Sequence, residues 1–378
     1  MKRVPIIDFI RFASIFIVIG GHFFPRWLVH FIGFPALQKV VLNIFLNGAY
    51  GVSCFFVVSG FLITRMMAEN TADFSTIDLR PFYVKRAARI FPLLLVVVLA
   101  AYGLEQLKFL LDSRVQQYHV WNNDSGFGWL FWISLFSFNF NWYLIAHYSA
   151  VGFQWSVLWS LAVEEQFYFF YPITVKLFRT RKRILTFLSC IILFALVFRW
   201  IASFYFLENG HWMQLASFAA FDQIAIGGIL YFFNEKAGDW LGARMKMSFG
   251  LLLLGTASCF YLCLSTSMLN GQELIVVPTL MAVGCALVIL GGLHVPIFNS
   301  KVAHILSWPG KLSYGCYLWH PTVMFLLMPV LVSLGGLWGL IYLVLAVSFF
   351  AFLSYRYFEV PVNRRIRAWF KLKPSLSV

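Results

Sequence analysis

Arg11 and His22 stand eleven residues apart within one apolar segment, residues 6–24. At about 100° per residue this spacing returns both side chains to one helix face, roughly 16 Å apart along the axis. A guanidinium and a titratable imidazole are costly inside a lipid-spanning helix, and by default they mark a polar path or a functional site. The alternative is an arginine that snorkels to the nearby interface and a histidine at the interface.

Glu164 lies in a second apolar segment. Ser160, Glu164 and Tyr168 recur every four residues and therefore share one helix face. Counted at about 1.5 Å per residue from the inner end, Glu164 lies roughly 20 Å deep, near His22 at roughly 24 Å. A histidine and a glutamate at matched depth form an acid–base pair, in which the imidazole removes a proton near neutral pH. The alternative is that Glu164 only pairs with Arg199 or with a donor on another helix.

Arg86 and Arg89 lie about one helical turn apart, at the predicted cytoplasmic end of a membrane span. Two guanidiniums in this arrangement suit the phosphates of an incoming ligand, because arginine binds phosphate oxygens in a bidentate manner. The same pair also suits plain anchoring at the membrane interface.

Ser59 belongs to a run of small residues, 51–63. It lies at roughly the depth of Arg11, about 8 Å from the inner surface, and could line a polar corridor. Gly51 and Gly60 in the same run favour close approach of neighbouring helices.

Four further polar residues are candidates. Tyr314 and His320 fall in one predicted span, with His320 roughly 12 Å deep beside Pro321, which frees a backbone carbonyl. Asp222 and Glu359 add two acids. Each of these could equally join helices by a hydrogen bond.

The elements that must position these residues are predicted to be membrane-spanning helices. Hydrophobic residues make up 61% of the 378 residues and charged residues 12%. A soluble domain carries about a quarter charged residues, so the composition predicts an all-α polytopic membrane protein. Asp8 and Arg11 interrupt the apolar start and no small-residue cleavage site follows, which predicts a retained first span and not a signal peptide. Ten spans are predicted, near residues 6–24, 44–64, 90–110, 154–177, 184–206, 216–233, 247–266, 273–292, 312–333 and 336–357.

The net charge of +14 is distributed unevenly over the predicted loops. With the N-terminus inside, inner segments hold 22 of the 29 basic residues and outer segments hold four. This bias predicts that both termini are cytoplasmic, in a multi-pass protein of the inner (cytoplasmic) cell membrane. The charge therefore reports topology and predicts no nucleic-acid partner. All six cysteines fall within predicted spans without metal-ligand spacing, so we expect them to pack in the core, with no disulfide framework and no metal.

The segments outside the spans are short. Counting Gly128–Tyr148 as a span would place the basic run 179–183 outside, so we expect an interfacial or re-entrant helix on the outer face. Residues 64–89 suit a surface helix on the inner side. We assign 1–365 to one membrane domain and 366–378 to a basic cytoplasmic tail.

Seven of these motifs stand together in one order, and in that order they resemble the membrane-bound acyltransferase 3 family over residues 1–365. The motifs are Arg11-x10-His22, the run 51–63, Arg86-x-x-Arg89-Ile90-x-Pro92, Trp159-Ser160-Leu161-x-x-Glu164-Glu165-Gln166-Phe167-Tyr168 with Pro172, Phe221-Asp222 before Gly227, Ser313-Tyr314-Gly315-x-Tyr317-Leu318-x-His320-Pro321, and Glu359-x-Pro361.

The resemblance implies a ten-span bundle that transfers an acetyl or other short acyl group. The donor would be cytoplasmic acetyl-CoA or another acyl-CoA, with no bound cofactor, and the acceptor a hydroxyl of an envelope glycan or lipid-linked sugar. In this family the arginine–histidine pair is functionally required, and it falls on Arg11 and His22. Many relatives carry a fused extracytoplasmic esterase-like domain that we do not find here, which leaves open a separate extracytoplasmic acyl-handling protein.

The hypothesis is a polar tunnel through the bilayer in which a thioester meets an acceptor hydroxyl. The donor phosphates would bind Arg86, Arg89 and Arg11, and the pantetheine arm would pass Ser59, Tyr314 and His320. His22 would act as general base or carry the acyl group itself. Glu164 would orient the imidazole, with Ser160, Tyr168, Asp222 and Glu359 in supporting roles. Aromatic residues of the stretch 121–159 could stack on a sugar or form an interface belt.

Two other functions also fit polar residues inside a membrane bundle. A proton-coupled transporter of a polar or anionic solute uses the same residue types, although the sequence shows no inverted repeat. A structural partner of an envelope assembly, or an accessory to a flippase, would predict neither CoA release nor solute uptake.

Overall fold

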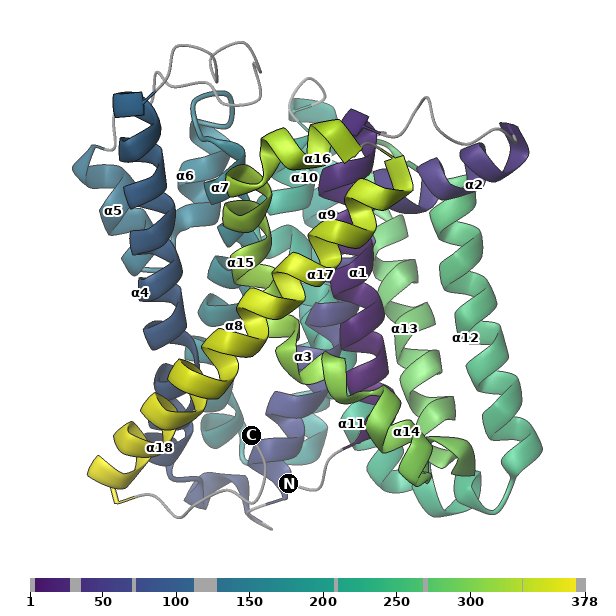
Figure 1. Ribbon diagram of the computed structural model, residues 1–378. Helices are drawn as coiled ribbons and strands as arrows, with labels where there is room; N and C mark the ends of the chain where they lie inside the picture. The colour runs from purple at the N-terminus through teal and green to yellow at the C-terminus, as the bar shows by residue number, and fades with distance from the viewer. Residues whose placement is uncertain are drawn as a thin grey trace. The chain divides into compact units, whose positions relative to one another are not determined.

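The computed structural model describes residues 4–27, 35–69, 73–111, 128–206, 210–267, 271–334 and 336–371, and of these it describes the side chains except at 24–27, 35–38 and 108–111. Throughout these ranges the chain forms helices and no strand (Figure 1). Within the same ranges, eight helices are long and apolar enough to cross a membrane, and a bent pair makes up to nine. The chain is therefore a polytopic, all-helical membrane protein, as predicted.

The described residues form two compact units that share one helix. The α4 unit comprises 78–162 and the described part of 312–378, and the α1 unit comprises the described parts of 3–77 and 163–311. Helix α8 (Leu158–Phe178) begins in the α4 unit and continues into the α1 unit. It coincides with the predicted fourth span but is not among the eight helices that are apolar enough to be candidate membrane spans.

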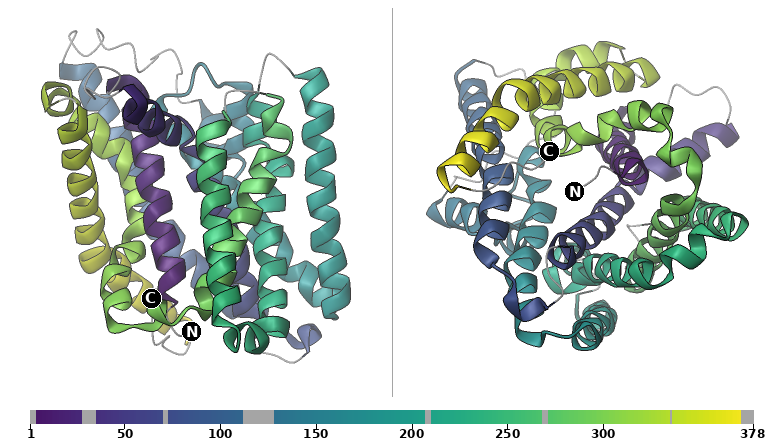
Figure 2. Two further views of the ribbon diagram at one scale, coloured as in Figure 1. Left: turned by 90° about the vertical axis from the view of Figure 1, so that its right-hand side faces the viewer. Right: turned by 90° about the horizontal axis from the view of Figure 1, so that it is seen from below.

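In the α1 unit, α3 packs against α1, α11 and α13, and α11 also packs against α9 (Figure 2). Its elements are α1 (Pro5–Trp27), α2 (Pro35–Leu46), α3 (Ala49–Ala68), η1 (Phe74–Thr76), α9 (Arg181–Tyr205), α10 (His211–Leu215), α11 (Ser217–Gly242), α12 (Met245–Ser265), η3 (Glu273–Ile275), α13 (Val277–His294), η4 (Pro296–Asn299), α14 (Lys301–Leu306) and η5 (Trp308–Leu312).

Glycines let α3 approach its neighbours closely. A Cβ added to Gly60 would lie 1.8 Å from the carbonyl oxygen of Ile224 on α11, and one added to Gly51 would lie 2.6 Å from that of Ser14 on α1. Any side chain at these positions would collide with backbone. The predicted packing role of both glycines is confirmed.

Helix α2 was not predicted, since the sequence pattern placed a span only from residue 44. It contacts α1 and α12, and Figure 1 shows it lying across the upper ends of these two helices. Asn43 Nδ2 donates to the carbonyl of Leu264 at 2.9 Å, and Asn47 Nδ2 donates to the carbonyls of Cys263 and Thr266. These amides satisfy carbonyls at the end of α12 that have no partner within the helix.

In the α4 unit, α4 packs against α15 and α18, and α15 packs against α17. Its elements, besides the start of α8, are α4 (Leu79–Leu111), α5 (Trp129–Phe136), α6 (Phe140–Ala146), α7 (Phe153–Ser156), α15 (Ser313–Leu326), α16 (Met328–Leu334), α17 (Gly336–Ser354), the π-helical segment η6 (Tyr355–Glu359) and α18 (Val360–Trp369). Buried residues of α4, α5, α6, α7, α15 and the start of α8 form one core cluster with Trp155, whose Nε1 donates to Glu105 at 3.0 Å.

Three predictions for this unit differ from the structure. The expected surface helix and third span form one 33-residue helix, α4, because Pro92 is accommodated inside it. The expected single helix over 128–148 is two short helices, α5 and α6, because Phe138 between them has a left-handed φ of 56°. The predicted ninth span is bent by 79° between α15 and α16.

All six cysteines lie in the described part of the chain and are free. Cys263, Cys285 and Cys316 are buried, but Cys190 is exposed on α9, so the expectation that it packs in the core is wrong. The proposed tail 366–378 is described only to residue 371, and Trp369 is the last residue of α18.

Candidate functional site

Helix α1 carries Arg11 and His22. The helix is continuous from Pro5 to Trp27, so the two side chains share one face, about 16 Å apart along the axis. Both are partly buried and both interact with other groups of the protein. This is the arrangement that the spacing predicted, while the chemical role of the pair stays a prediction.

The carboxylate of Glu164 accepts hydrogen bonds from two hydroxyl groups. One comes from Ser59 on α3 and the other from Tyr168, one turn along α8. This contact corrects the predicted depths, which placed Ser59 roughly 12 Å nearer the inner surface than Glu164. The depths were counted in residues from assumed span ends, which ignores the tilt of the helices. The predicted depth was therefore wrong for Ser59 on α3, for Glu164 on α8, or for both.

The alternative partner predicted for Glu164, Arg199, is fully engaged elsewhere. Arg199 and Asp222 are completely buried and paired at 2.8 Å. The Arg199 guanidinium also donates to the carbonyls of Ile275 and Ala219 and, at 2.5 Å, to the Thr279 hydroxyl. Its five N–H groups therefore all have acceptors.

This buried network joins α9, α11 and η3–α13. Thr279 in turn donates to Asp222 at 2.5 Å, so the carboxylate is held by two residues. We missed Thr279 in the sequence, which gives no signal for it, because its partners lie 57 and 80 residues away.

In the α4 unit, tyrosines on α15 connect that helix to its neighbours. The Tyr314 hydroxyl donates to the carbonyl of Ile90 on α4 at 2.9 Å. The Tyr317 hydroxyl lies 2.7 Å from Ser160 Oγ and donates to the carbonyl of Val157 at 2.6 Å. Tyr317 stood in the quoted motif without a role, and the structure gives it one.

His320 is buried on α15, with 1% of its surface exposed. Its Nδ1 lies 3.2 Å from the carbonyl oxygen of Cys316, one turn earlier. The adjacent Pro321 lacks the N–H that would bond to the carbonyl of Tyr317. His320 therefore lies next to a position of α15 at which one backbone hydrogen bond of the helix is missing.

Arg86 and Arg89 lie in the N-terminal third of α4, and Arg89 lies near Glu359. The carboxyl of Glu359 accepts from the Ser354 hydroxyl at 3.1 Å and interacts electrostatically with Arg89. Glu359 ends the π-helical segment η6, and π-helical segments are frequent at functional sites. A Cβ on Gly315 would lie 3.3 Å from its carboxylate oxygen, so α15 approaches it closely.

The predicted site residues thus form two sets, one in each unit. The α1 unit holds Arg11, His22, Ser59, Glu164, Tyr168 and Asp222, and the α4 unit holds Arg86, Arg89, Ser160, Tyr314, His320 and Glu359. Within the first set the structure brings Glu164 together with Ser59 and Tyr168, and it places Asp222 in the separate network with Arg199.

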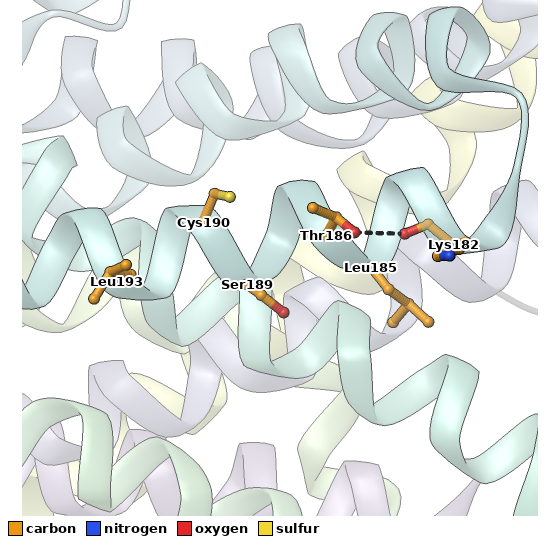
Figure 3. Close-up of a pocket in the computed structure, with 6 residues that line it drawn as sticks. All are labelled: Lys182, Leu185, Thr186, Ser189, Cys190 and Leu193. Carbon is orange, nitrogen blue, oxygen red and sulfur yellow. Dashed lines mark hydrogen bonds between the residues drawn. The ribbon is translucent and has the colours of Figure 1, made fainter.

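Among the described residues of the α1 unit, two hollows can be compared with the predicted site. One, of about 350 Å³, is lined by both apolar and polar residues where α1 begins, including Pro5, Phe61, Tyr231 and the ion-paired Arg65 and Glu69. The other, of about 570 Å³, is lined by residues of α9 alone, from Lys182 to Leu193 (Figure 3). A hollow lined by a single helix is a surface groove and offers no converging polar groups.

The aromatic side chains of α5, α6 and α7 pack largely on one another. Phe131 lies edge-on to Trp155 with ring centroids 5.3 Å apart, and Trp132 is 6.2 Å from the same ring. Trp129 is 70% exposed. The predicted sugar-stacking stretch also includes Trp121, which lies outside the described residues.

Comparison with known proteins identifies the family. A family model described as "Acyltransferase domain" matches residues 4–355, nearly the whole chain. The chain belongs to the acyltransferase 3 family. No solved structure matches it.

Several bacterial relatives resemble the chain along its length. The peptidoglycan O-acetyltransferase OatA of Listeria monocytogenes is 26% identical over 96% of this chain and 56% of its own length. A putative O-acetyltransferase of Staphylococcus aureus and the putative peptidoglycan O-acetyltransferase YrhL of Bacillus subtilis are each 25% identical, over 58% and 55% of their lengths. The chain therefore spans a little over half the length of the curated relatives it matches.

Proposed function

We propose that this chain transfers an acetyl group from acetyl-CoA to a hydroxyl of an envelope glycan. The observation that supports this most strongly is the family match over residues 4–355, together with relatives named as peptidoglycan O-acetyltransferases. A glycan of the peptidoglycan type is accordingly the acceptor we propose, and an acyl-CoA is the thioester donor.

The chemistry assigned to His22 is general base catalysis. The imidazole takes the proton of the acceptor hydroxyl as its oxygen attacks the thioester carbonyl carbon. The carbon–sulfur bond then breaks, and the leaving thiolate receives the proton from the imidazolium. The products are the acetyl ester and free CoA.

Glu164 is assigned to stabilise charge beside the first turns of α1, not at the imidazole. Gly48 lies against Gly21 and Gly51 against Ser14, so α3 runs antiparallel to α1 and places Ser59, with the Glu164 carboxylate that it binds, roughly 20 Å from His22 along the helix. Two hydroxyl donors, from Ser59 and Tyr168, hold its carboxylate in one orientation, which supports a positioned and not a mobile group. The engagement of Arg199 with Asp222 supports the same assignment, because it removes the buried cation that would otherwise compete for Glu164. Arg11 is assigned to the thioester or to a donor phosphate.

We further propose ten spans in the cytoplasmic membrane with both termini inside. Helix α8 would be the tenth, since its 21 residues extend about 31 Å, close to the roughly 30 Å of a hydrocarbon core. The concentration of basic residues in alternate loops supports this orientation.

The test is release of CoA by the purified chain in liposomes. We expect free thiol to appear when acetyl-CoA and an oligosaccharide of the peptidoglycan type are both present, with ester formation on the sugar in equal amount. Uptake of labelled solute without thiol release would instead identify a carrier and overturn the proposal.

A further inference from the structure

The first turns of α4 and helix α18 lie side by side and run in opposite directions. The two helices are in contact. At one end Arg80 lies 6.0 Å from the ring centroid of Phe370, and at the other Arg89 interacts electrostatically with Glu359. These two contacts set the register, so that residues 80–89 and 359–370 cover the same stretch, about 14–16 Å long.

This stretch carries charge of one sign. Neither residues 79–89 nor residues 360–371 contain a carboxylate, and together they hold eight basic residues: Arg80, Lys85, Arg86, Arg89, Arg364, Arg365, Arg367 and Lys371. We call these eight residues the basic surface.

Two carboxylates border the basic surface. Asp78, at its outer end, accepts from the backbone N–H of Arg80 at 3.0 Å, and Glu359, at its inner end, faces Arg89. Arg89 is therefore partly neutralised. Arg80, Arg364, Arg365 and Lys371 are exposed.

The depth of the basic surface favours a soluble ligand over a lipid headgroup. If the hydrocarbon core begins near Ile90, Arg80 lies about 15 Å farther out along α4. The headgroup layer on one side of a bilayer is only about 5–8 Å thick. The outer half of the surface therefore extends beyond the lipid phosphates, and Trp369 beside it is 82% exposed.

We propose that the basic surface binds the phosphorylated adenosine end of the acyl-CoA donor. This inference rests on the proposed function. The arginines bind the phosphates, and Trp369 provides a face on which the adenine can stack. The pantetheine arm then leaves from the Arg89 end, which is the end nearer the hydrocarbon core. Helix α18 lies past residue 355, where the family match ends, so the family match does not cover this role.

The experiment measures binding of adenosine 3′,5′-bisphosphate, which is this end of CoA without the thioester. The full chain is placed in nanodiscs of neutral phosphatidylcholine, so that lipid charge does not compete. The variant is Arg364→Gln with Arg365→Gln, two exposed positions. The matched control is Arg183→Gln with Lys246→Gln, which removes two exposed basic residues from α9 and α12.

We expect the wild type and the control to bind equally and the α18 variant to bind at least about tenfold more weakly. Equal binding by all three proteins would overturn the proposal. The proposal would also be overturned if the α18 substitutions weakened binding only in nanodiscs of anionic phosphatidylglycerol, since that result would identify a lipid-binding surface.

This test is separate from the test of the proposed function, because it uses neither acyl group nor acceptor. Binding that depends on α18 in a protein that transfers no acetyl group would refute the proposed function and leave the nucleotide site in place. If the α18 variant transfers acetyl groups with an unchanged KM for acetyl-CoA, the nucleotide site is refuted and the proposed function stands.

Discussion

Gly60→Ala is the substitution whose effect follows most directly from the packing. The added methyl would lie 1.8 Å from the carbonyl oxygen of Ile224, whereas an ordinary contact needs about 3.4 Å. The obstacle is backbone, so α3 and α11 must separate by about 1.6 Å. Such overpacking costs about 1–3 kcal/mol, partly offset by the roughly 1 kcal/mol by which alanine favours a helix over glycine.

The same displacement reaches the proposed site. Ser59 is the residue before Gly60, and its hydroxyl bonds to Glu164. A shift of about 1.6 Å breaks that hydrogen bond, and misplacement of this size in a catalytic arrangement costs about 100-fold in rate. We expect Gly60→Ala to lower both the midpoint of unfolding in detergent and the rate of acetyl transfer.

The matched control is Gly250→Ala on α12. An added methyl there has nothing within 4 Å, so only the helix preference changes. We expect a gain of up to about 1 kcal/mol in stability and unchanged transfer. If Gly60→Ala unfolds at the same midpoint as Gly250→Ala, the close crossing of α3 and α11 is refuted.

Three further predictions concern polar groups. Asp222→Asn leaves the buried Arg199 charge without its counter-ion and should lower the free energy of unfolding by about 3–5 kcal/mol. Asp222→Leu combined with Arg199→Met should recover most of that loss, because neither charge remains buried. A double variant that recovers none of it would contradict the ion-pair assignment. Tyr168→Phe removes one of the two hydroxyl groups that donate to the Glu164 carboxylate. It should lower kcat about tenfold with an unchanged KM for acetyl-CoA, and an unchanged kcat would argue that Tyr168 does not position Glu164. Hydrogen bonds from the Ser75 side chain and N–H lower the pKa of Asp73, so its contribution to stability is present above its ordinary pKa and is lost as the pH falls through the lowered value. Hydrogen exchange of the Ser75 amide should be faster in Asp73→Ala than in the wild type at pH 7, and this difference should shrink as the pH is lowered into the acid range; a difference that does not change with pH would contradict this.

Much of the helical architecture could be predicted from the sequence, because apolar length is a strong local signal. The span predicted at 184–206 is α9, Arg181–Tyr205, and that predicted at 247–266 is α12, Met245–Ser265. Helix α2 was missed, because its stability comes from contacts with α1 and α12 and not from its own apolar length. The break predicted between a surface helix ending near residue 89 and a span beginning near residue 90 is absent, because both belong to the continuous helix α4.

The candidate site was less predictable, because its partners lie on different helices. Four-residue spacing placed Ser160, Glu164 and Tyr168 on one face, and Tyr168 does bond to Glu164. The contact between Ser59 and Glu164 joins residues 105 apart, and no local pattern encodes it. The partner of Arg199 was equally hidden, since choosing between Glu164 and Asp222 requires the crossing of α9 and α11.

The central claim is that the α1 pair carries out acyl transfer. It is tested most directly by acetyl transfer from labelled acetyl-CoA in proteoliposomes holding His22→Ala, Arg11→Ala or, as a control histidine on α14, His304→Gln. We predict that the first two insert at normal yield and lose transfer, while His304→Gln retains it. Full transfer by His22→Ala and Arg11→Ala would contradict the claim.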